Sequence, residues 1–229
     1  MGAVGEVIPL FPLSSVLLPG MPLPLHIFEP RYRQLLADVD QGARSHGSFG
    51  VVALRSGTEA ANPRTGARPP DVEALGTVAE ILEVESSEDG TADLLSVGSR
   101  RFAVGRLIPE GKPYLRAEVE FLDEPEGALT PELGERARDL MAVYDAMLVR
   151  LAGRPTGPEL PDDANQLSYH VAARLPLPPA DRQELLADET TAQRLDRVAR
   201  LLRREIALLQ RTRSIAVSPS VLRMIIEAN

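Results

Sequence analysis

Apolar residues near the start of the chain form short runs that proline repeatedly interrupts. Six prolines lie between positions 8 and 30, and each fixes φ and removes a backbone amide donor. The pieces between them are too short for helices, so they predict short strands with proline at ends or edges. From Pro30 to Val39 the apolar spacing is helical, and Gly42 is a suitable stop. The pattern therefore predicts strands followed by a helix over residues 30–41.

The part of the chain that follows this helix also has the patterns of strands. An apolar run at 49–54 has the length of one strand. Residues 76–85 and 92–98 flank a turn pair that ends in Gly90, which predicts a hairpin. Apolar residues alternate with glutamate over 117–121, which is typical of a half-buried strand.

Two segments of this strand-rich part have the composition of connections. Residues 56–73 contain three prolines and few apolar residues, which predicts a long exposed loop. Gly98, Ser99 and Arg100 are interpreted as a turn between two strands.

Beyond residue 125 the apolar spacing changes to about 3.6 residues, the period of a helix. A long helix is predicted to begin at Thr130, whose hydroxyl is expected to act as its cap, and to end at Gly153. Further helices are predicted at 163–174, through Leu185 and at 190–212, with Leu195, Val198, Leu202, Ile206 and Leu209 buried on the last.

Strands followed by helices are the α+β pattern. The predicted organisation is a strand-rich part at 1–125, a helical part at 126–213 and a C-terminal tail at 214–229.

Several short motifs occur in an order that resembles the N-terminal substrate-binding domain of Lon proteases, especially its stand-alone version. They are PLFPL at 9–13, VLLPG at 16–20, PLPLHIFEPRYR at 22–33, LGTVAEI at 75–81 and LLSVGSRRF at 94–102. The ordered set is specific, although no single motif is decisive.

This resemblance implies a fold and a function. The fold would be a PUA-like β pseudo-barrel carrying one helix, followed by a C-terminal helical bundle. In full-length Lon the domain helps capture protein substrates, while the ATPase and the peptidase lie in later domains. The resemblance therefore implies a non-catalytic module whose partners are unfolded or extended polypeptide segments. The cytoplasm is the expected location, because the sequence shows neither the pattern of a signal peptide nor that of a membrane span.

Contact residues are predicted where the first strands meet the first helix, at Phe28, Glu29, Arg31 and Tyr32. The alternative is that both aromatic rings are core and that the two charged residues form local hydrogen bonds. Strand edges offer a second mode of binding, in which an extended segment adds to the sheet.

The single lysine of the chain, Lys112, limits the possible chemistry. A Lon-type ATPase needs a Gly-rich loop ending in Gly-Lys-Ser/Thr, but Pro113 follows this lysine. A Lon-type peptidase needs a lysine that activates a serine, whereas Lys112 is predicted to be a solvated turn residue. The sequence therefore predicts a protein that is not an enzyme and has no catalytic residues.

Metal and cofactor sites are not expected either. The chain has no cysteine, and its three histidines, His26, His46 and His170, are far apart in sequence. Glu83 and Glu85 alternate along a predicted strand and are interpreted as its solvent-exposed face rather than as a catalytic pair.

The net charge of −8 argues against general nucleic-acid binding. A local exception is residues 194–213, which hold seven arginines. They are interpreted as a solvated helix face, and contact with RNA or an acidic partner is the alternative. RNA binding by a PUA-like fold, and a small hydrolase with an unrecognised site, remain the other hypotheses for function.

No basic region precedes the first apolar segment and no apolar stretch approaches the ~20 residues of a membrane span, so neither a signal peptide nor a membrane location is expected.

Overall fold

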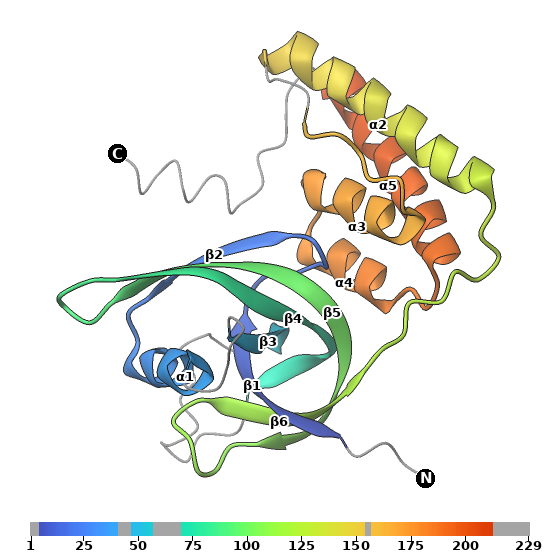
Figure 1. The fold of residues 1–229 in the computed structure, drawn as a ribbon. Helices are drawn as coiled ribbons and strands as arrows, with labels where there is room; N and C mark the ends of the chain where they lie inside the picture. Colours follow the sequence, from blue (N-terminus) through green and yellow to red (C-terminus); the bar gives the residue numbers. More distant parts are fainter. Residues whose placement is uncertain (1–4, 41–46, 57–69, 154–156, 213–229) are drawn as a thin grey trace. The chain divides into compact units, whose positions relative to one another are not determined.

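Figure 1 shows a computed structural model of the chain, which describes residues 5–40, 47–56, 70–153 and 157–212. The chain divides into two compact units, Met1–Asp123 and Glu124–Asn229, hereafter unit 1 and unit 2. The described residues of unit 1 form six strands and one helix, and those of unit 2 form four helices. The predicted α+β class is confirmed.

The elements follow the chain in a simple order. Unit 1 contains β1 (Glu6–Leu13), β2 (Pro22–Ile27), α1 (Pro30–Asp40), β3 (Ser48–Ser56), β4 (Asp71–Ser86), β5 (Ala92–Ile108) and β6 (Leu115–Phe121). Unit 2 contains α2 (Pro131–Ala152), α3 (Ala164–Arg174), α4 (Pro179–Ala187) and α5 (Thr191–Thr212).

The strands of unit 1 close on themselves. The sheet order is β2-β5-β4-β3-β1-β6, and β6 also pairs with β5, so five strands form a barrel and β2 is added at the edge of β5. β1 and β3 are parallel, and the other pairs are antiparallel. The 17 residues of β5 allow this closure, because its first half pairs with β2 and β4 and its second half with β6. The closure confirms the predicted pseudo-barrel.

Two apolar clusters stabilise unit 1. One surrounds the fully buried ring of Phe102 and draws on β1, β3, β4, β5 and β6, so it fills the barrel. The other lies beneath α1, where Tyr32 and Leu35 of the helix meet Phe11 and Phe49 of the strands. The helical spacing of apolar residues after Pro30 therefore packs α1 against the barrel.

The hairpin of β4 and β5 is longer than the two predicted runs, at 71–86 and 92–108. The predicted turn pair is confirmed at its tip. Gly90 has φ +80, and the Asp89 carboxylate accepts hydrogen bonds from the backbone N–H and hydroxyl of Thr91 at 2.9 and 2.7 Å. The hairpin and β2 run side by side and project from the barrel (Figure 1).

The predicted turn at Gly98 is wrong, because this glycine lies inside β5. Its carbonyl accepts a hydrogen bond from the Gly20 N–H at 2.8 Å, and its own N–H donates to the Met21 carbonyl at 3.0 Å. A Cβ atom at Gly98 would lie 2.3 Å from the Leu18 carbonyl oxygen. The glycine is needed because the segment before β2 passes directly over β5, a contact that local sequence does not indicate.

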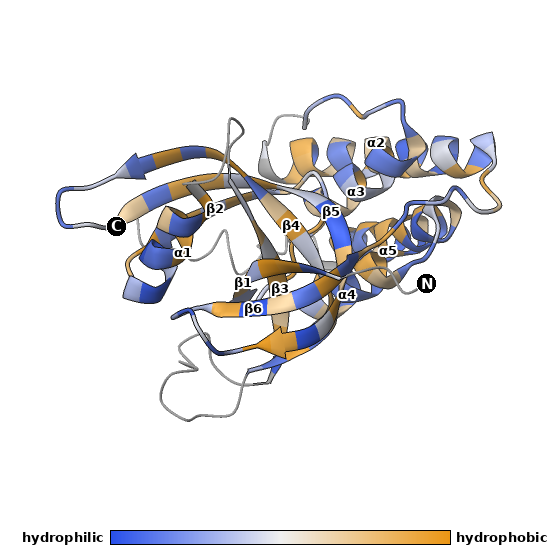
Figure 2. Ribbon diagram, turned by 60° about the horizontal axis from the view of Figure 1, so that its bottom comes forward, coloured by the Kyte–Doolittle hydropathy of each residue, from blue (hydrophilic) through white to orange (hydrophobic). Residues whose placement is uncertain are grey.

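The helices of unit 2 are amphipathic, and apolar and polar residues alternate along them in Figure 2. α2 and α5 pack along each other, and α3 contacts both. The predicted stripe of α5 is confirmed, since Leu195, Val198, Leu202, Ile206 and Leu209 are all buried. The predicted cap of α2 is wrong: Thr130 makes no capping hydrogen bond, and its hydroxyl instead bonds the Glu132 carboxylate and lowers its pKa.

Three sequence predictions fall partly or wholly outside the described residues. Most of the predicted loop at 56–73 does so, and its last three residues belong to β4. The helix stop at Gly42 and the tail at 214–229 also lie outside.

Candidate functional site

The four residues predicted to make contacts lie at the corner between β2 and α1, with different exposure. The Phe28 side chain is 59% exposed, whereas Arg31 and Tyr32 are buried. The Tyr32 ring stacks on Phe11 with 3.9 Å between centroids. Of the four, Phe28 and part of Glu29 are therefore accessible, and the other two hold the corner in place.

An ion pair and several hydrogen bonds hold this corner in place. The Arg31 guanidinium contacts the Glu29 carboxylate at 2.8 Å and lies 4.6 Å from the centre of the Tyr32 ring. The Arg33 side chain donates to the Phe28 carbonyl at 2.9 Å, and its backbone N–H donates to the Glu29 carbonyl at 3.1 Å. The exposed Phe28 side chain is consequently carried on a fixed backbone.

Next to this corner lies a three-stranded part of the sheet, which we call the arm: β2, residues 80–86 of β4 and residues 92–97 of β5. Cross-strand partners point to the same face of a sheet. One face of the arm carries Leu23, Leu25, Ile27, Ile81, Ala92 and Leu94, which belong to or pack against the apolar cluster beneath α1. These six residues are therefore committed to the core, whereas Val84, which pairs with Leu94 on the same face, is 41% exposed.

The opposite face, which we call the outer face, consists of three transverse rows of residues. They are Pro22–Val97–Glu80, Pro24–Leu95–Glu83 and His26–Asp93–Glu85. A register shift adds Leu82 beside Glu83. Leu82 and Leu95 are 50% and 38% exposed, and they lie on neighbouring strands. The outer face therefore presents apolar groups in its middle and carboxylates along β4.

The row nearest the corner connects the outer face with Phe28. The His26 ring nitrogen Nδ1 lies 2.8 Å from the Asp93 carboxylate, and the His26 ring stacks on Phe28 with 6.2 Å between centroids. Phe28 is thus continuous with the outer face rather than isolated on a loop.

The free edge of β2 is poorly suited to the addition of another strand. The carbonyls of Met21 and Leu23 face β5, from which they accept hydrogen bonds at 3.0 Å each. Because alternate residues direct their backbone groups to opposite sides, Pro22 and Pro24 face the free edge. Proline has no N–H, so this edge lacks donors at both positions. The geometry favours binding on the outer face over strand addition at β2.

Lys112 is not simply a solvated turn lysine, because it takes part in a cluster that ties α1 to the β5–β6 connection. Its ammonium group donates to Asp38 at 2.8 Å, the Tyr114 hydroxyl donates to the same carboxylate oxygen at 2.5 Å, and Gln34 donates to the other at 2.9 Å. These bonds, led by that from Lys112, lower the pKa of Asp38 to about 2. The cluster is structural and holds Lys112 away from nucleophilic chemistry.

We predict that Asp38→Asn lowers the free energy of unfolding at neutral pH by about 2 kcal/mol, as expected for hydrogen bonds to a charged group. Since the folded pKa of about 2 lies below the unfolded value of about 3.9, the stabilisation is present above pH ~4 and is lost as the pH falls towards 2. Urea unfolding at several pH values should therefore show a steeper acid loss for the unsubstituted chain than for Asp38→Asn. Asp139→Asn, on the exposed side of α2, is the matched control. Equal acid profiles for all three proteins would contradict this prediction.

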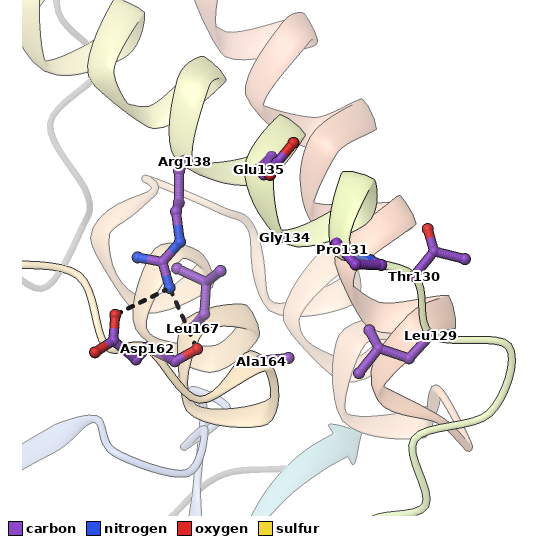
Figure 3. Close-up of a pocket in the computed structure, with 9 residues that line it drawn as sticks. All are labelled: Leu129, Thr130, Pro131, Gly134, Glu135, Arg138, Asp162, Ala164 and Leu167. Atoms are coloured by element: carbon purple, nitrogen blue, oxygen red, sulfur yellow. Dashed lines mark hydrogen bonds and ion pairs between the residues drawn. The ribbon is translucent and has the colours of Figure 1, made fainter.

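Unit 2 contains a hollow of about 330 Å³ between the start of α2 and the start of α3 (Figure 3). Arg138 points across it and donates to the carbonyls of Leu160, Pro161 and Asp162. Its guanidinium group is therefore used to hold the connection before α3, and the hollow presents no free charged group from this arginine.

The arginines of α5 form the predicted solvated face at Arg200, Arg203, Arg204 and Arg211, whereas Arg194 departs from it. Arg194 is fully buried. Arg197 pairs with Asp188 and Glu184, Arg200 with Asp196, and Arg204 with Asp181. Most of the positive charge of this helix is thus neutralised within unit 2, which weakens the case for a nucleic-acid or acidic-partner surface here.

Within the described residues, no group of three or more His, Asp or Glu side chains is placed to hold a metal ion. None of the described helices has the length and apolar character needed to cross a bilayer.

Comparison of the chain with known proteins identifies one family. Residues 7–204 match the family model of the ATP-dependent protease La (LON) substrate-binding domain. The chain is 32% identical over 215 residues to Lon protease 2 of Syntrophobacter fumaroxidans, covering 90% of this chain and 25% of that protein. It is 30% identical over 207 residues to the Lon protease of Methylocella silvestris, covering 87% and 24%. The chain thus spans about a quarter of the length of the curated relatives it matches.

Solved structures agree with this assignment. The crystal structure of a Lon N-terminal domain protein from Xanthomonas campestris aligns with a TM-score of 0.62 at 30% identity, covering 84% of this chain and 96% of the other. The N-terminal domain of a Mycobacterium avium complex Lon protease aligns with a TM-score of 0.59 at 19% identity, covering 86% and 98%, and shows the fold alone.

Proposed function

We propose that this chain, which belongs to the LON substrate-binding domain family, binds extended or unfolded segments of other polypeptides and has no catalytic activity of its own. The observation that carries this proposal is the outer face of the arm, where Leu82 and Leu95 stay exposed on neighbouring strands, next to the exposed Phe28 at the corner. Exposed apolar residues that gather on one face are typical of an interaction surface. We place this activity in the cytoplasm as part of the same proposal.

The exposed apolar groups are sufficient for weak, sequence-tolerant binding. Full burial of a leucine or phenylalanine side chain is worth about 1.5–3 kcal/mol, so covering these three partly exposed side chains yields several kcal/mol. Ordering a flexible segment opposes this gain. These three side chains alone therefore account for binding weaker than micromolar, which corresponds to about −8 kcal/mol, and other contacts of the segment must supply the remainder of a micromolar affinity.

The corner between β2 and α1 has two roles in this proposal. Phe28 and Glu29 contact the bound segment, because their side chains are accessible. Arg31 and Tyr32 position them through the ion pair and the stacked ring. Support for a non-catalytic role comes from Lys112, whose ammonium group is engaged by Asp38 in the part of the chain described.

We predict that replacing both Leu82 and Leu95 by threonine weakens binding roughly tenfold or more, because each substitution removes about 1 kcal/mol of apolar contact. Threonine keeps the preference for a strand, so the arm should stay folded. The measurement is fluorescence anisotropy of a labelled, permanently unfolded polypeptide titrated with the full chain.

The matched control is Val143→Thr with Val149→Thr, which changes two exposed apolar side chains of α2 instead. This control should bind as the unsubstituted chain does. Absence of binding up to about a millimolar, or an equal loss in both double variants, would rule out the outer face as the binding surface.

A further inference from the structure

We infer that the outer face selects apolar segments flanked by lysine or arginine. This inference rests on the proposed function and names the class of polypeptide that fits. The observation behind it is the composition of the three transverse rows, each of which ends in a glutamate of β4: Glu80, Glu83 or Glu85.

The three glutamates form a line of negative charge beside the apolar centre. All three are exposed, and none has an ion-pair partner within the described ranges 5–40, 47–56, 70–153 and 157–212. Glu83 and Glu85 are alternate residues of β4, about 7 Å apart, which is less than the Debye length at physiological salt, and Glu80 lies in the next row beyond the register shift. The carboxylates therefore repel one another, and a bound cation relieves that repulsion.

The arm itself supplies little positive charge to offset this line. His26 is the one basic residue in its sequence, and it lies against Asp93 at 2.8 Å. The nearby Arg33 is directed elsewhere, since its side chain donates to the Phe28 carbonyl. The outer face therefore has net negative charge around Leu95 and Pro24.

The layout of the face matches a particular kind of ligand. Neighbouring strands are about 4.8 Å apart, so the line of carboxylates lies one strand away from Leu95 and two strands away from Pro24. A segment lying on the face can place apolar side chains over these two residues and extend long basic side chains to the β4 line. Lysine and arginine suit this role, because their apolar stems cover Leu82 while the charged ends reach the glutamates.

The same charges disfavour two other occupants. A second copy of this chain carries a net charge of −8 and the same acidic face, so two outer faces repel each other. An apolar segment flanked by aspartate or glutamate meets like charge along β4, which opposes binding.

The test uses three fluorescent peptides with one apolar core and flanks of lysine, serine or glutamate, titrated with the full chain at about 0.02 M and 0.5 M salt. The expected order of affinity is lysine, then serine, then glutamate. Lysine flanks should bind about tenfold more tightly than serine flanks at low salt, since each exposed ion pair contributes modestly. This difference should shrink at high salt.

The variant Glu80→Gln with Glu83→Gln and Glu85→Gln should lose most of the preference for lysine flanks while it still binds the serine peptide. Its control, Glu120→Gln with Glu159→Gln and Glu189→Gln, removes the same charge from exposed positions outside the arm and should keep the preference.

The possible results separate the two proposals. Equal affinity for all three peptides would overturn the preference for basic flanks and leave the proposed polypeptide binding intact. Equal loss of the preference in both triple variants would show that net charge, not the arm, selects the peptide, which also overturns the inference. Failure of every peptide to bind would overturn the proposed function as well.

Discussion

Replacing Arg194 by methionine should lower the free energy of unfolding of unit 2 by about 3 kcal/mol, the lower end of the range for removing one partner of a buried ion pair, because the Glu124 side chain stays 25% exposed. Arg194 is fully buried on α5. Its guanidinium group donates to Glu124 at 2.9 Å and to Ser168 at 2.8 Å, and it lies 4.0 Å from the centre of the Tyr169 ring. Methionine fills similar space but leaves these polar partners unsatisfied.

This arginine also connects the start of unit 2 with its helices. Glu124 is the first residue of the unit, and it accepts a hydrogen bond from the Tyr169 hydroxyl at 3.0 Å as well as from Arg194. The backbone carbonyls of Pro125 and Glu126, which follow, accept hydrogen bonds from the N–H groups of Thr191 and Ala192 at the start of α5. Loss of Arg194 is therefore expected to loosen residues 124–126 as well as α3.

The measurement is urea unfolding of the full chain followed by circular dichroism at the helix band, to which unit 2 contributes four of the five described helices. Arg203→Met is the matched control, because Arg203 lies on the exposed face of the same helix. It should change stability by no more than about 0.5 kcal/mol. If the two variants unfold at the same urea concentration, the buried network does not contribute as the structure indicates.

Replacing Gly98 by alanine should destabilise unit 1 by about 3 kcal/mol, at the upper end of the usual cost of adding atoms to a packed region. The added Cβ would lie 2.3 Å from the Leu18 carbonyl oxygen, which belongs to backbone and cannot rotate away. Relief requires the segment before β2 to move off β5. That movement would break the hydrogen bonds of Gly98 with Gly20 and Met21.

Hydrogen exchange of the full chain can localise this effect. Amides of β2 and of the first half of β5 should exchange faster in Gly98→Ala, while those of α5 should not change. The matched control is Gly134→Ala in α2, where the nearest atom to the added Cβ is 3.8 Å away. Because alanine is a better helix former, this control should stabilise unit 2 by roughly 0.5–1 kcal/mol. If the amides of β2 exchange at the same rate in the Gly98→Ala variant as in the unsubstituted chain, the close-contact argument is refuted.

Local periodicity by itself determined the elements whose burial follows from their own residues. The stripe on α5 and the alternation in β6 are visible in sequence because side chains recur with the period of the element that holds them. The turn at Gly90 follows from the residue types that accept positive φ. The position of the corner at Phe28 also follows from sequence, since its prolines and apolar residues mark the change from strand to helix.

The tertiary structure alone decided what depends on pairing between distant parts of the chain. The three rows of the outer face join β2, β5 and β4, so Leu95 lies beside Pro24 and Glu83 only because of the register of those strands. Sequence could show that Glu83 and Glu85 share an exposed face, but it could not show that leucines lie beside them.

Arg194 and Gly98 illustrate the same limit. Arginine usually lies on the solvated side of a helix, and only the convergence of Glu124, Ser168 and Tyr169 stabilises its charge inside unit 2. Glycine followed by serine has the composition of a turn, and only the passage of Leu18 over β5 explains why a strand needs it. Sequence periodicity reports how a residue relates to its own helix or strand, whereas these environments arise from contacts between segments that folding brings together.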